Sequence, residues 1–287
     1  MNPRREAIVD AALTQLTSVP KVERIAITSA DGVRLAGVHL VGAGPTAFVI
    51  CHSFTHRTAR PKTRKLLETF ARHASVVAFD MRGHGRSGGR STVGEREHVD
   101  LDAALGWARD AGYARVVTVG FSLGGAVVLR HAALGTDRAD AVVAVSAPAR
   151  WYARETPALR RVHWLLEQPH GKAAARLLGV RLDGAWATVP PSPVELVGSV
   201  APTPLLLVQF DGDSYFSTAH GAALAAASGG HAQLWTEPGR GHGESGTTAA
   251  LVARIAAWGL VDGRSGDAST VGPHTPAGRR AKSSEVG

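Results

Sequence analysis

One serine lies in a segment whose residue types and spacing could support nucleophilic chemistry. An apolar, β-branched run over Val116–Val119 enters a Gly-x-Ser-x-Gly pattern made by Gly120, Ser122 and Gly124, and an apolar helical pattern follows from Leu123. A strand, a sharp turn and a helix in this order hold a serine hydroxyl at the end of a sheet. The flanking glycines leave room for the strand and the helix to approach each other. The segment therefore predicts a nucleophilic Ser122.

The same five-residue pattern occurs a second time in the chain, so the pattern alone does not identify a nucleophile. Gly85, Ser87 and Gly89 also match it, but this match follows a polar loop and runs into Arg90–Thr92. No predicted strand leads into it. We therefore expect Ser87 to lie in a loop.

A base and an acid are the next requirement, because a serine hydroxyl at its ordinary pKa is a weak nucleophile. In an open parallel sheet, reactive groups gather beyond the carboxyl ends of the strands. Asp213 follows the apolar strand pattern Leu205–Val208, and His242 follows the next one, Ala232–Thr236. Among the 13 histidines of the chain, His242 alone comes just after the last predicted strand. We predict that His242 is the base and Asp213 the acid.

A second aspartate, Asp211, stands in the same loop and is the alternative acid. Asp213 is favoured because Asp211 and Gly212 could form the turn that presents it. The strand predicted over Ala141–Val145 ends in Ser146 and offers no carboxylate. In the favoured assignment, Asp213 holds the imidazole of the base in one tautomer and stabilises its protonated form.

Acyl transfer also requires donors for the negative charge that develops on the carbonyl oxygen, commonly two backbone N–H groups. The first is the N–H of Leu123, the residue after the nucleophile. We assign the second to Phe54, in the loop that follows the strand ending at Cys51. His52 in this loop is interpreted as a structural residue that braces it.

The apolar patterns along the chain predict how these residues are positioned. After a strand pair over Val22–Thr28 and Val33–Leu40, short apolar strands alternate with helices. The strands are expected at 47–51, 76–79, 116–119, 141–145, 205–208 and 232–236, and the helices at about 60–72, 95–110, 123–134, 217–227 and 246–259. Near-continuous apolar strands that alternate with helices predict an α/β fold with a mostly parallel central sheet and helices on both faces.

This alternation stops between Ala147 and Pro204, where helical patterns at 155–167 and 171–178 precede a proline-rich stretch. We interpret the segment as an inserted helical lid. The expected parts of the chain are an N-terminal helix over 1–21, a first core part over 22–147, the lid over 148–203, a second core part over 204–261 and a tail over 262–287. The tail is rich in Gly, Ser, Thr and Pro, so we expect it to be disordered.

Composition excludes several classes of protein. The chain has 287 residues, 44% of them hydrophobic, which suffices for one large domain with a buried core. The single cysteine, Cys51, excludes an internal disulfide, and no Cys/His cluster has the spacing of zinc ligands, so we expect no metal site. The net charge of +8 is dispersed along the chain without a nucleic-acid-binding motif, and we expect no nucleic-acid partner.

The distribution of apolar residues bears on the membrane and on the partner. No stretch approaches about 18 uninterrupted apolar residues, and the first residues lack the apolar core of a secretion signal. We therefore expect a cytoplasmic protein with no integral membrane segment. The expected partner is a small-molecule acyl substrate that is partly apolar. The patterns leave the oligomeric state open.

Taken together, these motifs resemble the α/β-hydrolase superfamily, and particularly its lysophospholipase, monoacylglycerol lipase and serine aminopeptidase-like branch. The resemblance covers about Val33–Leu260. It is carried by His52-Ser53-Phe54, by Asp80-Met81-Arg82-Gly83-His84-Gly85-Arg86-Ser87, by Gly120-Phe121-Ser122-Leu123-Gly124, by Asp213 and by Gly241-His242-Gly243. The resemblance implies the α/β-hydrolase fold, no cofactor, and structural roles for Asp80, Arg82 and Ser87.

The resemblance also implies a serine hydrolase that cleaves a carboxylic ester, or a thioester or amide, through an acyl-enzyme. Ser122 would attack the carbonyl, and His242 would take its proton and later activate water. The same fold and triad also serve cofactor-free haloperoxidases and carbon–carbon bond hydrolases, and a third interpretation is a member that binds a ligand without turnover. Two residues depart from the family pattern, since Ser53 replaces a glycine in the oxyanion loop and Phe210 replaces one in the acid loop.

Residues of the expected lid bear on substrate recognition. Six apolar side chains could line an acyl pocket, although helix packing explains each of them equally well: Trp151, Tyr152, Trp164, Leu165, Leu166 and Trp186. A further hypothesis is that three lid arginines attract an anionic substrate: Arg150, Arg154 and Arg160.

Overall fold

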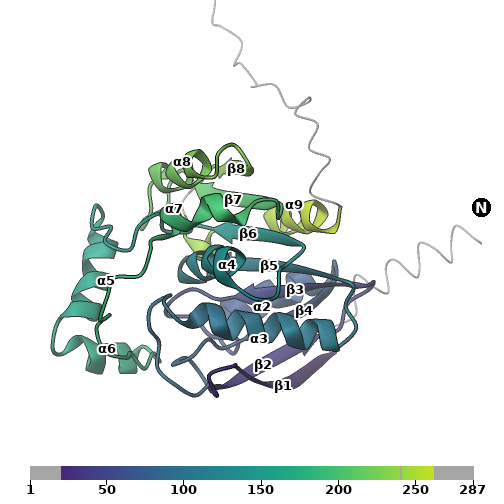
Figure 1. Ribbon diagram of the computed structural model, residues 1–287, viewed down its shortest axis with the longest axis horizontal. Helices are drawn as coiled ribbons and strands as arrows, with labels where there is room; N and C mark the ends of the chain where they lie inside the picture. The colour runs from purple at the N-terminus through teal and green to yellow at the C-terminus, as the bar shows by residue number, and fades with distance from the viewer. Residues whose placement is uncertain (1–20, 240, 262–287) are drawn as a thin grey trace, which may run out of the picture.

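The computed structural model describes residues 21–239 and 241–261, and eight strands within these ranges form one sheet (Figure 1). The strands are β1 (Val22–Thr28), β2 (Arg34–Leu40), β3 (Thr46–Cys51), β4 (Ser75–Phe79), β5 (Arg115–Phe121), β6 (Ala141–Val145), β7 (Leu205–Phe210) and β8 (Ala232–Glu237). Residues 1–20 of the helix expected over 1–21 and the tail expected over 262–287 lie outside the described residues.

The sheet is mostly parallel, as predicted. Its strands lie in the order β1-β2-β4-β3-β5-β6-β7-β8, and all neighbouring pairs from β4 to β8 are parallel. The hairpin β1–β2 is antiparallel, with Val22 opposite Leu40 and Thr28 opposite Arg34, and β2 pairs antiparallel with β4. The central strands are buried along almost their whole length, which explains their near-continuous apolar sequences.

Two strands continue two residues beyond the carboxyl ends that their apolar patterns indicated. The strand β5 continues through Gly120 to Phe121, and β7 continues to Phe210. Pairing with β6 and β8 supplies backbone partners for these added residues. As a result, Ser122 and Asp211 are the first residues after their strands.

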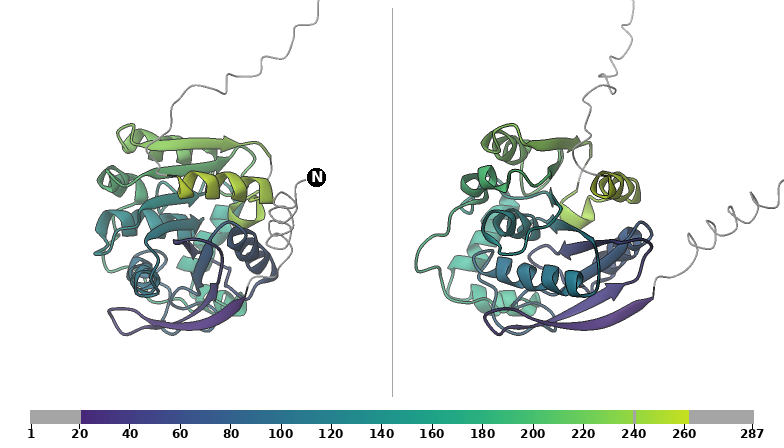
Figure 2. Two further views of the ribbon diagram at one scale, coloured as in Figure 1. Left: turned by 90° about the vertical axis from the view of Figure 1, so that its right-hand side faces the viewer. Right: turned by 45° about the vertical axis from the view of Figure 1, so that its right-hand side comes forward.

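Helices cover both faces of the sheet (Figure 2). On one face lie α2 (Pro61–Ala71) and α9 (Ala249–Leu260), whose apolar side chains share a core with one side of the sheet. On the other face lie α3 (Glu97–Asp110), α4 (Leu123–Leu134) and α8 (Thr218–Ala227). The predicted α/β architecture is confirmed, and within the described residues no helix is both long and apolar enough to cross a bilayer.

The segment between β6 and β7 carries α5 (Pro157–Glu167), α6 (Gly171–Leu177), the short α7 (Pro193–Leu196) and a 3₁₀ helix, η1 (Val197–Val200). Helices α5 and α6 stand apart from the helical layers in Figure 1 and enclose a small core of their own. Isolated bridges from His84 to Val180 and from Ser91 to Leu182 fasten this segment to the loop after β4. In contrast, η1 contributes Val197 to the main core.

Candidate active site

The chain turns sharply at Ser122, between β5 and α4. Ser122 has φ of 54° and ψ of −113°, a strained conformation for a residue with a side chain. Its N–H donates to Val145 O at 2.9 Å. A Cβ on Gly120 would lie 2.1 Å from Gly124 O, and a Cβ on Gly124 would lie 2.3 Å from Cys51 O. Glycines at these positions therefore permit the close contact between strand and helix.

The fold brings His242, from the loop after β8, next to Ser122. The distance from His242 Nε2 to Ser122 Oγ is 2.8 Å. The other ring nitrogen, Nδ1, lies 3.0 Å from each carboxylate oxygen of Asp213. Because an ionised carboxylate only accepts hydrogen bonds, Nδ1 carries the proton, and Nε2 accepts from the Ser122 hydroxyl. The three predicted residues thus form one continuous hydrogen-bonded series.

The carboxylate of Asp213 is fully enclosed and is held by several donors. Tyr215 N and Phe216 N donate to its Oδ1 atom at 2.8 and 3.2 Å, and Gln209 Nε2 donates to its Oδ2 atom at 3.4 Å. Burial acts to raise the pKa of Asp213, but the hydrogen bond from His242 and these further donors outweigh burial and hold the pKa below its ordinary value. Asp213 is therefore ionised at neutral pH.

The alternative acid, Asp211, has other partners. Its Oδ1 atom accepts a hydrogen bond from Gly239 N at 2.8 Å, and its N–H donates to Glu237 O at 3.0 Å. Asp211 thus ties the loop after β7 to the end of β8. The structure places the favoured aspartate, and not the alternative, beside the imidazole.

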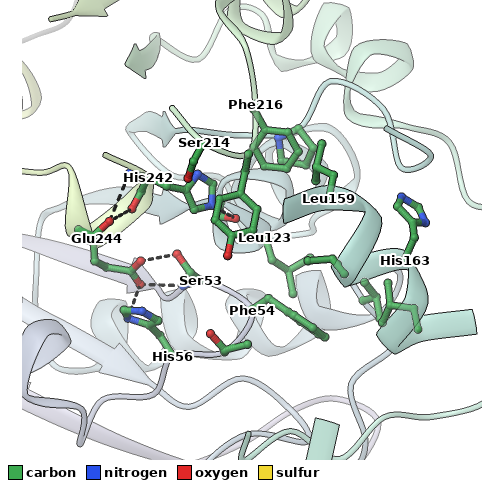
Figure 3. Close-up of a pocket in the computed structure, with 18 of the residues that line it drawn as sticks. Ser53, Phe54, His56, Leu123, Leu159, His163, Ser214, Phe216, His242 and Glu244 are labelled. Carbon is green, nitrogen blue, oxygen red and sulfur yellow. Dashed lines mark hydrogen bonds and ion pairs between the residues drawn. The ribbon is translucent and has the colours of Figure 1, made fainter. Parts of the chain in front are cut away.

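The two predicted oxyanion donors belong to residues that line the same cavity as Ser122, and Figure 3 labels both of these residues. Phe54 and Leu123 both line it, and among the described residues neither backbone N–H donates to a protein acceptor. Ser53 differs, because its N–H donates to Glu244 Oε1 at 2.8 Å. Free N–H groups beside a nucleophile are suited to stabilising a developing oxyanion.

Glu244 is a buried acid that the sequence patterns did not single out. Its carboxylate accepts hydrogen bonds from both the N–H and the hydroxyl of Ser53, and His56 Nδ1 lies 3.5 Å from its Oε1 atom (Figure 3). These contacts join the loop that carries His242 to the loop that carries Phe54. A glycine at position 53 would lack the hydroxyl that makes one of them. The position of Glu244 two residues after His242 was its only signal in the sequence.

His52 braces the loop after β3. Met81 N donates to its Nε2 atom at 3.1 Å, so Nδ1 carries the proton and donates to Ser53 O at 2.8 Å. Burial, with a smaller contribution from the neighbouring His84, lowers the pKa of His52 to about 3. A neutral imidazole with both nitrogens engaged has a structural role.

Asp80 and Arg82 hold the loop after β4 in place. Asp80 accepts a hydrogen bond from Thr58 N at 2.7 Å. The guanidinium of Arg82 pairs with Asp100 at 2.6 Å and with Asp31 at 2.8 Å. Hydrogen bonds from Arg82 hold the pKa of Asp31 at about 2. Asp80 and Arg82 do not line the cavity over Ser122, and their contacts stabilise the loop after β4.

A cavity of about 290 Å³ with mostly apolar walls opens over Ser122. Helix α5 contributes Leu159 and Leu166 to its walls. Tyr215, an aromatic residue that the patterns missed, stacks on the imidazole of His242 with ring centroids 4.2 Å apart. Its position two residues after Asp213 was the signal in the sequence that could have identified it. Ser122 therefore faces a space suited to an apolar ligand group.

The six apolar residues expected to line an acyl pocket divide into three groups. Trp151 and Leu166 line the cavity over Ser122. Tyr152 and Trp186 line a smaller cavity of about 130 Å³, which shares Trp151 and Leu166 with the first. Trp164 is 52% exposed. Leu165 packs in the small core between α5 and α6.

The three lid arginines also have separate environments. Arg150 lines the cavity over Ser122. Arg154 pairs with Glu167 at 2.5 Å, and Arg160 donates to the carbonyl oxygens of Arg154 and Glu155. Only Arg150 of these three faces the cavity.

Comparison with known proteins adds a family assignment. Residues 46–192, just over half of the chain, match the family model described as the alpha/beta hydrolase fold. No curated protein is similar enough in sequence to count as a match.

Several solved structures share the fold. Esterase Pf2001 of Pyrococcus furiosus is 21% identical, with a TM-score of 0.66 over 83% of this chain and 90% of that one. The alpha/beta hydrolase GrgF from Penicillium sp. sh18 is 17% identical, with a TM-score of 0.62 over 83% and 97% of the two chains. Est1E from Butyrivibrio proteoclasticus, solved with bound ferulic acid, is 19% identical, with a TM-score of 0.56 over 82% and 98%.

Proposed function

The chain belongs to the alpha/beta hydrolase fold family, and on that premise we propose that it is a serine hydrolase that cleaves carboxylic esters through an acyl-enzyme. The observation that carries the proposal is the series from Ser122 Oγ through His242 to Asp213, with 2.8 Å at the first contact and 3.0 Å at the second. An oxygen nucleophile, an oriented neutral base and an ionised acid are the parts that acyl transfer requires.

In the first half of the reaction, Ser122 Oγ attacks the ester carbonyl carbon while His242 Nε2 takes the hydroxyl proton. The enclosed carboxylate of Asp213 stabilises the imidazolium that results. When the tetrahedral intermediate collapses, the bond to the leaving oxygen breaks and His242 donates its proton to that oxygen. The products of this half are an alcohol and an acyl group on Ser122.

In the second half, water replaces the alcohol. His242 Nε2 removes a proton from water, the resulting hydroxide oxygen attacks the acyl carbonyl, and the proton returns to Ser122 Oγ as the acid leaves. The N–H groups of Phe54 and Leu123 are the proposed donors to the oxyanion in both halves. Ser53 N is occupied by Glu244, whereas Phe54 N has no protein acceptor among the described residues.

The expected substrate is an ester with an apolar acyl or aryl group. The mostly apolar cavity over Ser122 and the adjoining space beside Trp186 support this class. We further propose that residues 148–203 form a lid over the site, since α5 supplies Leu159 and Leu166 to the cavity walls. The lysophospholipase, monoacylglycerol lipase and serine aminopeptidase-like branch stays a prediction, as do thioester and amide substrates.

Covalent labelling tests the proposal directly. The full chain would be treated with a fluorophosphonate probe, and the modified residue would be mapped by mass spectrometry. We expect labelling at Ser122, with hydrolysis of p-nitrophenyl and aryl esters that Ser122→Ala removes. An unlabelled Ser122, or ester hydrolysis that survives Ser122→Ala, would contradict the proposal. A series of increasing acyl chain length would then report the depth of the cavity.

A further inference from the structure

A second cavity lies between the loop after β3, the loop after β4 and the end of α6, and it shares no lining residue with the cavity over Ser122. Its volume is about 670 Å³, and five arginines line it: Arg57, Arg60, Arg86, Arg176 and Arg181. Within the described residues, the one acidic side chain of its lining is Asp80. We propose that this cavity binds an anion that carries phosphate groups.

Most of the positive charge in this cavity has no counterpart among the described residues. Among the described residues, four of the five guanidinium groups make no hydrogen bond or ion pair, and the fifth, that of Arg181, donates to the carbonyl oxygen of Ser87. The carboxylate of Asp80 is already engaged, because it accepts hydrogen bonds from Thr58 N at 2.7 Å and from Arg86 N at 3.1 Å. Like charges that converge without acceptors repel one another, and a bound anion removes that repulsion.

The walls of the cavity are held by backbone contacts. Arg181 N donates to Gly83 O at 2.8 Å, and Arg181 O accepts from Ser91 N at 2.7 Å. The Nη1 atom of Arg57 lies 3.0 Å from the place that a Cβ on Gly179 would occupy. A glycine there lets the guanidinium lie directly over the backbone. A binding site whose walls are already ordered loses little conformational entropy when it takes a ligand.

The residue types favour phosphate over other anions. The planar guanidinium group donates two parallel hydrogen bonds to phosphate oxygens, and five such groups exceed what one carboxylate can satisfy. The volume falls within the range of about 300–1,000 Å³ that is usual for small-molecule sites. Within the described residues, no aromatic ring lines the cavity, so the base stacking that single-stranded nucleic acid requires has no platform there.

The loop after β3 separates this cavity from the proposed active site. His56 lines the cavity over Ser122, and Arg57 lines the arginine cavity. Burial lowers the pKa of His56, Glu244 opposes this, and the charges of Arg60 and Lys62 lower the pKa further. The charge of one arginine of this cavity, Arg60, therefore acts on a residue that lines the neighbouring site. Phosphate binding itself would occur whether or not Ser122 is a nucleophile.

Calorimetric titration of the full chain with inorganic pyrophosphate tests the inference. We expect one pyrophosphate per chain and an affinity that falls with added salt. Arg57→Gln and Arg176→Gln should each weaken binding on the order of tenfold, because each removes charged hydrogen bonds. Arg57→Lys keeps the charge but loses the planar fork, so it should weaken binding less than Arg57→Gln.

Arg138→Gln is the matched control, because Arg138 is exposed between α4 and β6 and does not line the cavity. It removes the same charge and should leave pyrophosphate affinity unchanged. Circular dichroism would establish that each variant is folded, and the exposed Arg176 gives a second variant if Arg57→Gln does not fold. Absence of pyrophosphate binding, together with absence of binding to the vesicles described next, would overturn the inference. So would an equal loss of affinity in Arg138→Gln.

Vesicles distinguish a soluble phosphate from a lipid headgroup. The two lipid arms are phosphatidylcholine alone and phosphatidylcholine with phosphatidic acid. Binding to pyrophosphate without vesicle binding would assign a soluble ligand. Binding to phosphatidic acid vesicles that Arg176→Gln weakens and Arg138→Gln does not would assign a lipid phosphate. A DNA oligonucleotide would test for general attraction between charges. If Arg176→Gln and Arg138→Gln weakened its binding equally and pyrophosphate showed no selective binding, the proposed phosphate site would be contradicted.

Discussion

Ser122 and Ser87 occupy two copies of the same five-residue pattern, and the fold gives them different environments. Ser122 follows β5, adopts a positive φ and faces a cavity with its Oγ atom 2.8 Å from His242 Nε2. Ser87 is buried in the loop after β4, where its hydroxyl donates to Asp80 O and accepts from Ala36 N at 2.9 Å. Backbone groups are the hydrogen-bond partners of the Ser87 hydroxyl, whereas the imidazole of His242 is the partner of the Ser122 hydroxyl. The two serines therefore differ in their partners, which the five-residue pattern around each does not determine.

The first prediction contrasts the two serines. Ser122→Ala should lower kcat/KM for ester hydrolysis by roughly 10⁴-fold or more, because no nucleophile remains. Ser87→Ala should leave the catalytic groups intact but lower the free energy of unfolding by about 1–3 kcal/mol, because Ala36 N loses its buried acceptor. Steady-state kinetics and urea denaturation of both variants check this. Normal activity of Ser122→Ala, or loss of activity in a folded Ser87→Ala, would contradict the roles proposed for the two serines.

The second prediction concerns the proposed acid, Asp213. Asp213→Asn should lower kcat by about 10³- to 10⁴-fold, because an amide cannot hold the imidazole in the productive tautomer. Asp211→Asn is the matched control from the same loop, and its kcat should stay close to that of the unmodified chain. The two kcat values at neutral pH decide the matter. Equal losses would mean that the loop as a whole, and not the carboxylate of Asp213, is required.

The third prediction uses the glycines of the two patterns. Gly120→Ala should lower the free energy of unfolding by about 3 kcal/mol, because the added Cβ would lie 2.1 Å from Gly124 O. Gly88→Ala is the control, since its Cβ would lie 3.4 Å from its nearest neighbour, Arg34 O, at ordinary contact distance. Its effect should stay within about 1 kcal/mol. Chemical denaturation measures both changes, and a tolerated Gly120→Ala would contradict the close approach of β5 and α4.

The fourth prediction concerns the link between the His242 loop and the Phe54 loop. Glu244→Gln should lower kcat on the order of tenfold with little change in KM, because a weaker bond to Ser53 leaves the oxyanion donor less well positioned. Glu237→Gln, which removes a carboxylate paired with Arg254, is the control and should leave kcat unchanged. A rise in KM without a fall in kcat would instead indicate that Glu244 acts on substrate binding.

The fifth prediction, with the smallest expected effect, concerns Asp31, which pairs with Arg82 and stabilises the fold. The pKa of Asp31 lies at about 2 in the folded chain, below its ordinary value of 3.8. A lowered pKa stabilises the fold above the ordinary value, and this stabilisation is lost as the pH falls towards the folded value. Asp31→Asn should therefore lower the unfolding free energy by about 1 kcal/mol at pH 7 and by less near pH 2. Thermal melts across this range check the trend, which a constant difference would contradict.

Much of the fold could be predicted from local sequence. Buried parallel strands require near-continuous apolar residues, so β3 to β7 were visible along the chain, and the turn after β5 requires small residues on both sides of Ser122. The ends of β5 and β7 were less visible, because Gly120 and Gln209 interrupt the apolar pattern while neighbouring strands still supply hydrogen bonds. Local composition therefore indicates that a strand exists better than where it ends.

The order of strands in space was beyond the reach of these patterns. That order places the loop after β7 beside the loop after β8, where Asp213 reaches His242, and it brings Glu244 to Ser53 across 191 positions of the chain. It also gathers arginines from three separate segments around one cavity. Each of these contacts depends on the direction in which a loop leaves its strand.

The sequence by itself determined the kinds of element and the chemical groups available, because hydrophobic periodicity and turn residues act through local backbone preferences. Only the tertiary structure decided which of those groups meet. Distances between side chains remote in sequence depend on how the whole sheet is ordered and packed.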